Sequence, residues 1–161
     1  MKTYTPTTVF LILFLLLFEA SGQTPSATIP DFTFYQLNGT PFTKSQITGN
    51  TKVLFIFFDI SCKHCQKEVE EIGKNYKEFS RMSLYMVSLD EPAHISAFMD
   101  KYGKRLKDKK NVTLLHDKDR VFIPKFSPTK YPALFIYSAK GKLIQYFGGE
   151  IKIKELIKAI K

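Results

Sequence analysis

The sequence has no tryptophan, only two cysteines and only three histidines in 161 residues. A structural zinc site usually takes four ligands. The candidates here are the two cysteines, His64 between them, and the distant His94 and His116. Covalent haem attachment needs a histidine directly after the second cysteine, and Gln66 occupies that position. We therefore expect neither a metal site nor a haem.

The sequence also lacks an apolar run long enough to be an obvious membrane span, which needs about 20 residues. The N-terminus has a basic residue, Lys2, then an apolar stretch over residues 9–18 and a group of small residues. This pattern is typical of a signal peptide cleaved before Gln23, and an uncleaved anchor is the alternative. The sequence thus predicts a signal peptide over residues 1–22 and a single domain over 23–161. We expect export to the periplasm or cell envelope, where disulfides are permitted.

Acidic residues are outnumbered, with 15 Asp and Glu against 24 Lys and Arg, so the formal net charge is +9. Such an excess can steer a protein toward nucleic acid, anionic lipid or acidic partners. The densest basic stretch, residues 101–110, is interrupted by Asp108 and contains a single aromatic residue, Tyr102. This is typical of a solvated helix end and loop. We expect no nucleic-acid partner, and membrane association no more than loose.

The chain is organised around residues 53–79, which combine a buried strand with a helix. The first six form an unbroken apolar run, typical of a central strand covered on both faces. Apolar residues then recur at steps of three and four, at Cys65, Val69, Ile72, Tyr76 and Phe79. This predicts one amphipathic helix ending near Phe79, with Cys65 toward the core and Cys62 at its start. There, free backbone N–H groups and the positive end of the helix dipole favour a thiolate.

The flanking segments complete an α/β pattern. Asn38-Gly39 is a hairpin turn signal between two short apolar stretches. Further strands are expected over 83–89, 112–115, 133–137 and 143–147, helices over 93–102 and 152–161, and a helical turn over 119–126 broken by Pro124. The order predicts an α/β fold with a mixed central β-sheet flanked by helices and an N-terminal β-hairpin extension.

The C-x-x-C spacing of Cys62 and Cys65 is interpreted as a redox pair. A disulfide closing so small a loop stabilises little by chain entropy, so a purely structural role is a weak alternative. A pair that follows a buried strand and opens a helix is typical of thiol–disulfide exchange. Lys63 and His64 add positive or proton-donating character, which should favour the Cys62 thiolate and ease its departure as a leaving group. The redox-active disulfide would then be the only cofactor.

With these features the sequence resembles the exported thioredoxin-fold thiol–disulfide oxidoreductases of the TlpA-like group, in the redoxin (AhpC/TSA-like) superfamily. That group includes the reductases of cytochrome c maturation. The resemblance covers nearly all of the predicted mature chain. It rests on VLFIFF before C-K-H-C, an inserted segment over 91–117, and SPTKYPALFI over 127–136 followed by Lys-Gly-Lys. It implies a thioredoxin-like fold that exchanges disulfides with protein substrates and with a redox partner protein.

The resemblance assigns roles to matching positions. Cys62 would be the exposed nucleophile and Cys65 the buried resolving thiol. Pro132 would be a cis-proline facing the pair, and Tyr131 would contact substrate through its backbone. Glu68, three residues after Cys65 and therefore beside it on a helix, matches a family carboxylate. If partly buried, it would have a raised pKa and could accept the Cys65 proton; an exposed, solvating role is the alternative.

The chain departs from the family pattern at several positions. Ile56 stands where thioredoxins carry a buried acid, and Ser61 stands where tryptophan usually precedes the first cysteine. Asp59 is expected to solvate the strand exit rather than relay protons. Tyr131 is bulky for its position. Because His64 also occurs in oxidising exported members, the direction of electron transfer stays open.

Two other functions on the same fold remain as alternatives. A peroxidase of the peroxiredoxin type needs threonine three residues before the reactive cysteine, where this chain has Asp59. A copper-binding or chaperone module would use Cys62, Cys65 and a distant histidine such as His116. Copper assembly factors of this fold usually space their cysteines more widely, so thiol–disulfide exchange is the preferred interpretation.

Overall fold

The computed structural model describes residues 24–47 and 50–161. The predicted signal peptide over residues 1–22 lies outside the described residues. Within these, seven strands form one mixed sheet in the order β2-β1-β5-β4-β3-β6-β7. Their bounds are β1 Thr33–Gln36, β2 Pro41–Thr43, β3 Val53–Phe57, β4 Ser83–Ser88, β5 Val112–His116, β6 Ala133–Tyr137 and β7 Leu143–Gly148.

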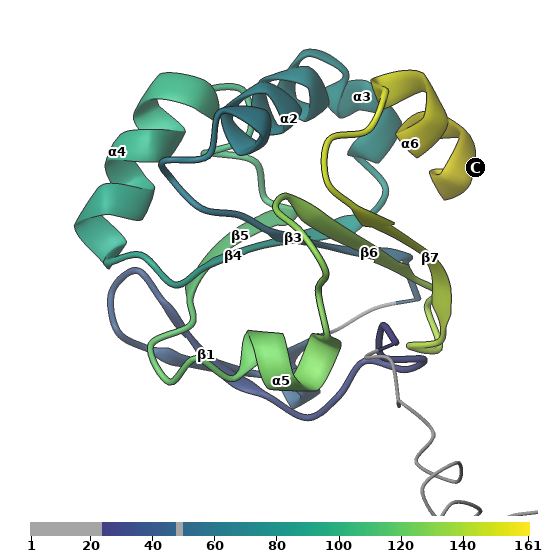
Figure 1. Ribbon diagram of the computed structural model, residues 1–161, viewed down its shortest axis with the longest axis horizontal. Coiled ribbons are helices and arrows are strands. Elements are labelled where there is room, and N and C mark those ends of the chain that lie inside the picture. The colour runs from purple at the N-terminus through teal and green to yellow at the C-terminus, as the bar shows by residue number, and fades with distance from the viewer. Residues whose placement is uncertain (1–23, 48–49) are drawn as a thin grey trace, which may run out of the picture.

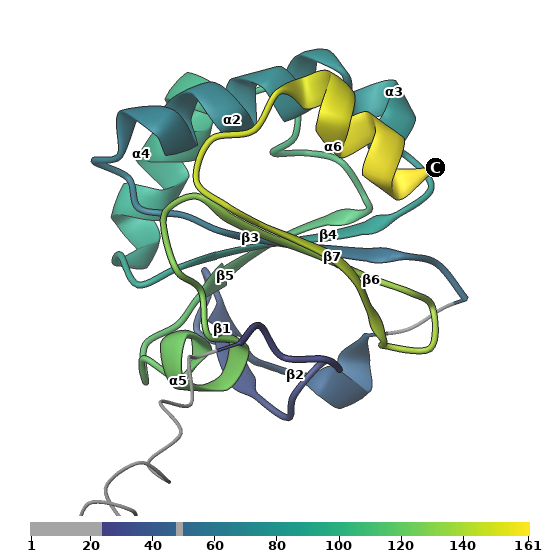
Figure 2. The same cartoon turned by 45° about the vertical axis from the view of Figure 1, so that its right-hand side comes forward.

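Helices cover both faces of this sheet. Figures 1 and 2 show α2, α3, α4 and α6 together on one face, and α5 on the other face near the N-terminal hairpin. Their bounds are α2 Lys63–Lys74, α3 Tyr76–Phe79, α4 Pro92–Tyr102, α5 Phe122–Phe126 and α6 Ile153–Ile160, with a 3₁₀ turn at Lys44–Gln46. The predicted α/β class, with a mixed central β-sheet flanked by helices, is confirmed.

Strand β3 lies at the centre, parallel to β4 on one side and antiparallel to β6 on the other. All of its residues are buried because both faces of the sheet are covered, which explains the unbroken apolar run. Alternate side chains point to opposite faces. Leu54 and Ile56 belong to the core beneath α2, whereas Phe55 and Phe57 belong to an aromatic core around α5. The start of α2 therefore follows a strand that is packed on both faces.

The predicted N-terminal hairpin is confirmed and forms one edge of the sheet. Phe34 on β1 pairs with Phe42 on β2. The turn places Gly39 at φ 85°, in the left-handed region that favours glycine, and the Asn38 side chain accepts the Thr40 N–H at 3.0 Å. Because β1 also pairs antiparallel with β5, the hairpin continues the main sheet.

The prediction of one uninterrupted helix from the cysteine pair to Phe79 is wrong, because the helix breaks at Asn75. This residue has φ −104° and ψ 21°, outside helical geometry. Its side-chain amide donates to the Glu71 carbonyl oxygen at 2.9 Å, and its backbone N–H also donates to that oxygen. A short polar side chain that bonds a nearby backbone group competes with helix propagation. The apolar periodicity continues across the break, since Phe79 is fully buried in α3.

The expectation that Pro124 breaks a helical turn is also wrong. Pro124 is the third residue of α5, Phe122–Phe126. The first backbone N–H groups of a helix have no partner within it, so a proline there removes no hydrogen bond. The helix ends instead at Ser127, which adopts a left-handed conformation with φ 55°.

Candidate active site

The turn between β3 and α2 is shaped by Asp59. Its Oδ1 atom accepts the Ser61 backbone N–H at 2.7 Å and the Ser61 hydroxyl at 2.5 Å. Its carbonyl oxygen accepts the Cys62 N–H at 3.3 Å. Ile60 is held from the other side, because its N–H donates to the Asp90 carboxylate at 3.1 Å. Asp59 thus acts locally on the turn, in keeping with the solvating role expected of it.

Cys62 is the N-cap residue of α2, and Cys65 follows at the third helical position. Both are free thiols; Cys62 is half-buried and Cys65 is fully buried, as the periodicity predicts. The Cys65 backbone N–H donates to Cys62 Sγ at 3.3 Å. A sulfur at this position receives a backbone hydrogen bond and faces the positive end of the helix dipole, and both favour negative charge on it.

The buried thiol has the opposite tendency. Burial raises the pKa of the Cys65 thiol strongly, and the hydrogen bond with Cys62 raises it further. A thiol with a raised pKa is a poor nucleophile unless a nearby base takes its proton. The two sulfurs of the pair are therefore chemically unequal before any substrate arrives.

Glu68 lies one helical turn beyond Cys65 and is only 2% exposed. Burial raises the pKa of its carboxyl group to about 7, although a hydrogen bond from the Ile151 N–H at 3.3 Å acts in the other direction. The other carboxylate oxygen, Oε1, is buried and has no hydrogen-bond partner among the described residues. The expectations of burial and of a raised pKa are confirmed, so the alternative of an exposed Glu68 is wrong.

The predicted cis peptide bond between Tyr131 and Pro132 is present. Pro132 is buried at the start of β6, and the Tyr131 ring lies 4.9 Å from the Phe57 ring, centroid to centroid. Burial, followed by the nearby charges of Asp59 and Cys65, raises the pKa of Tyr131 to about 12. Tyr131 therefore stays neutral at physiological pH. With Phe57 and residues 128–130 it lines a recess of about 110 Å³.

Lys63 and His64 are exposed on the first turn of α2. His64 Nδ1 lies 2.5 Å from Glu150 Oε2, and the other Glu150 oxygen accepts from the Lys67 ammonium group. The sequence reasoning missed Glu150, which lies 86 positions beyond His64. The only local signal was its place directly after Gly148-Gly149, which marks a strand end and not an active site.

The residues of the copper alternative are not brought together. Across residues 24–47 and 50–161, no three His, Cys, Asp or Glu side chains are grouped as metal ligands would be. His116 is buried on β5 and His94 is exposed on α4. Among the described residues, Asp59, Glu68, His64 and the cis-proline loop lie near the cysteine pair.

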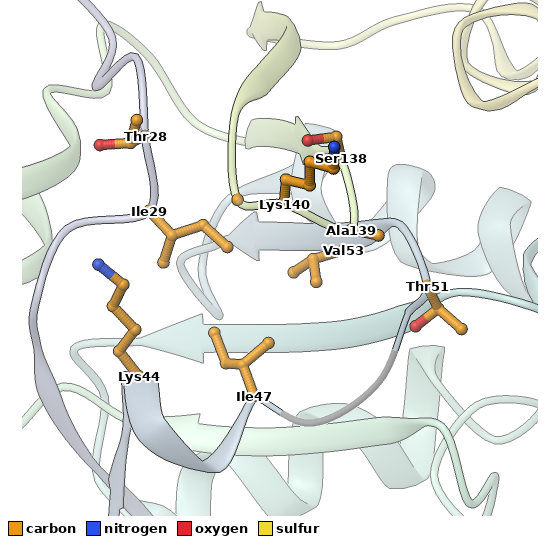
Figure 3. Close-up of a pocket in the computed structure, with 10 residues that line it drawn as sticks. Thr28, Ile29, Lys44, Ile47, Thr51, Val53, Ser138, Ala139 and Lys140 are labelled. Carbon is orange, nitrogen blue, oxygen red and sulfur yellow. The ribbon is translucent and has the colours of Figure 1, made fainter.

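A second recess, of about 200 Å³, lies at the other end of β3, by Val53 (Figure 3). Lys44 and Lys140 contribute the charged side chains of its wall, which contains no thiol, imidazole or carboxylate. It offers no group for redox chemistry. No helix within the described part of the chain is both long and apolar enough to cross a bilayer.

The AhpC/TSA family model matches residues 25–146, so the chain belongs to this family. The thiol-disulfide oxidoreductase ResA of Bacillus subtilis is 24% identical over 123 residues, which cover 74% of this chain. The match covers 65% of ResA, slightly less than two thirds of its length. The resemblance to the redoxin superfamily stated from the sequence is confirmed.

Solved structures identify the fold as thioredoxin-like. The structure of dsbF of Mycobacterium tuberculosis in its mixed oxidised and reduced forms matches with a TM-score of 0.69 and 22% identity, covering 85% of this chain and 97% of that one. Peroxidoxin BcpB of the same organism also matches with a TM-score of 0.69, at 19% identity, covering 86% and 97%. The two match with the same TM-score, so these comparisons identify the fold and not the reaction.

Proposed function

We propose that this protein is an exported thiol–disulfide oxidoreductase that exchanges disulfides with protein substrates through Cys62 and Cys65. The observation that carries the proposal is the asymmetry of the pair. Cys62 is half-buried and its Sγ accepts a backbone N–H at the start of α2, while Cys65 is fully buried. Attack and resolution need two such unequal sulfurs. The ResA relative carries the same activity in its name.

In the reducing direction, the Cys62 thiolate attacks one sulfur of a substrate disulfide. A bond forms between Cys62 Sγ and that sulfur, and the other substrate sulfur leaves as a thiolate. Cys65 then attacks Cys62 Sγ, which forms the Cys62–Cys65 disulfide and releases the first substrate sulfur. Two electrons pass from the cysteine pair to the substrate, and a redox partner protein must return them. The oxidising direction is the same sequence in reverse.

Glu68 would accept the Cys65 proton during resolution. Its pKa of about 7 suits a group that must take up and release a proton near neutral pH. Its Oε1 atom has no hydrogen-bond partner among the described residues, whereas Oε2 accepts the Ile151 N–H. Tyr131 and Pro132 would hold the substrate backbone beside Cys62. These roles for Glu68, Tyr131 and Pro132 are proposals that follow the family resemblance and fit their placement.

The experiment follows turnover of insulin or glutathione disulfide by the purified protein. We expect turnover with the native chain and none with Cys62→Ser. Cys65→Ser should accumulate a mixed disulfide that identifies the protein partners. The reduction potential of the pair then gives the direction, since about −270 mV suits a reductant and about −120 mV an oxidant. Native protein that turned over neither substrate would contradict the proposal.

The peroxidase alternative is kept because peroxidoxin BcpB has the same fold. Asp59 stands where that chemistry needs threonine, and its Oδ1 is engaged by Ser61. Hydrogen peroxide consumption with a fast second-order rate would favour this alternative. Export and location in the periplasm or cell envelope are tested separately, by determining whether the N-terminus of the mature protein is Gln23.

A further inference from the structure

Residues 149–151, in the segment between β7 and α6, bond through their backbone N–H groups to the cis-proline loop and to Glu68 of α2. The Gly149 N–H donates to the Pro132 carbonyl oxygen at 2.8 Å. The Ile151 N–H donates to Glu68 Oε2 at 3.3 Å. Gly149 has φ 96°, a backbone conformation that residues with a Cβ atom rarely adopt. The segment is thus shaped to join the cis-proline loop to α2.

The residue between them, Glu150, corrects an unfavourable charge distribution at the start of α2. The helix begins with Lys63 and His64, continues with Lys67, and has no acidic residue in its first turn. Cations at a helix N-terminus oppose the helix dipole. Glu150 brings one carboxylate, whose two oxygens bond separately to His64 and to Lys67. Both contacts lower the pKa of Glu150, so its carboxylate stays ionised.

We propose that Glu150 is a positioning residue for the cysteine pair: its carboxylate holds the His64 imidazole and the Lys67 ammonium group at the start of α2, with His64 two positions from Cys62. The inference rests on the proposed disulfide exchange. With His64 protonated, the group formed by His64, Lys67 and Glu150 carries one net positive charge, and with His64 neutral it carries none. A nearby cation favours the Cys62 thiolate, stabilises the reduced pair, and so makes the disulfide a stronger oxidant.

Other charged groups surround the same turn and must be held constant. Asp59 faces it from the β3–α2 turn, and Glu68 and Glu71 lie further along α2. Glu150 also carries its own negative charge, which by itself would disfavour the Cys62 thiolate. The direct and the His64-mediated effects of Glu150 therefore have opposite signs, and a measured potential separates them.

The experiment equilibrates the full-length protein with glutathione buffers and measures the oxidised fraction. It compares the native chain, Glu150→Gln, His64→Asn and the double variant. We expect Glu150→Gln to shift the equilibrium constant toward the disulfide by up to about threefold, because release of the His64 and Lys67 side chains from the start of α2 outweighs removal of the Glu150 charge. A tenfold change corresponds to a potential about 30 mV more negative. His64→Asn should give a shift of the same sign. In that background Glu150→Gln should shift the constant back toward the dithiol, because only the direct effect of the Glu150 charge is then left.

Glu155→Gln is the matched control, because Glu155 lies on α6 and forms no ion pair with a described residue; its equilibrium constant should match the native value. A shift toward the dithiol in Glu150→Gln, no shift, or an equal shift with His64→Asn already present would overturn the proposal. If Glu150→Gln did not fold, the His64→Asn shift alone would still test it. Failure of the proposed function would look different, since the native pair itself would not then equilibrate.

Discussion

Two buried carboxylates, one on each side of the central sheet, show how the same kind of side chain serves different purposes. Asp117 is fully buried at the α5 end, where its two oxygens accept the N–H groups of Val121 and Phe122 at 2.9 and 2.8 Å. Glu68, on the α2 side, accepts one hydrogen bond from the described residues, and its other carboxylate oxygen has no partner among them. Burial raises the pKa of both groups.

The difference lies in what remains available to each group. Both oxygens of Asp117 accept backbone N–H groups at the start of α5, so this side chain stabilises the backbone there. Glu68, one helical turn from Cys65, has one carboxylate oxygen that accepts no hydrogen bond from the described residues. An unsatisfied buried polar atom costs stability. Such a cost is expected where a residue serves the chemistry of the site and not the stability of the fold.

The largest expected effect is on the rate of resolution. Glu68→Gln should slow the attack of Cys65 on a preformed Cys62 mixed disulfide about 10²-fold, because a positioned base contributes at least this much. The native rate should rise with pH through about 7, and the variant should lack that rise. Stopped-flow measurement of thiol release checks both. Glu70→Gln, on the same helix, is the control; an unchanged rate in Glu68→Gln would refute the proton-acceptor role.

The second effect is on the free energy of unfolding. The folded pKa of Glu68, about 7, lies above its ordinary value of 4.5. The folded state therefore binds the proton more tightly, and this stabilisation is complete below the unfolded pKa and is lost as pH rises through the folded one. From pH 4.5 to 7 the native protein should lose about 2 to 4 kcal/mol more than Glu68→Gln does. Urea unfolding of both across this range measures it; parallel curves would contradict the burial of Glu68.

The smallest effect is expected on the other side of the sheet. Asp117→Asn should lower the free energy of unfolding by about 1 to 3 kcal/mol. The amide nitrogen of asparagine would face a backbone N–H and could not accept a hydrogen bond from it. The rate of disulfide exchange should stay at the native value. Urea unfolding and insulin turnover on the same samples test this. If exchange slowed as much as in Glu68→Gln, the distinction between the two carboxylates would fail.

Local sequence patterns were enough to predict much of the molecule. The apolar run of β3 and the periodicity after it placed Cys62 at a helix start and Cys65 in the core, because strand and helix repeats are properties of neighbouring residues. Proline and glycine signals placed the hairpins in the same way. The resemblance to a known family added the cis bond at Pro132 and singled out Glu68, but only the structure showed that Glu68 is buried.

Only the tertiary structure decided which groups surround the cysteine pair. Asn75 ends α2 through a side-chain bond that competes with an otherwise continuous helical repeat. Glu150 reaches His64 across 86 positions of chain because β7 and α6 return beside α2. A contact of that kind leaves no mark on local periodicity, since it depends on where the chain ends up and not on which residues are neighbours in sequence. The position of the sulfur atoms was thus a property of the sequence, and their electrostatic surroundings a property of the fold.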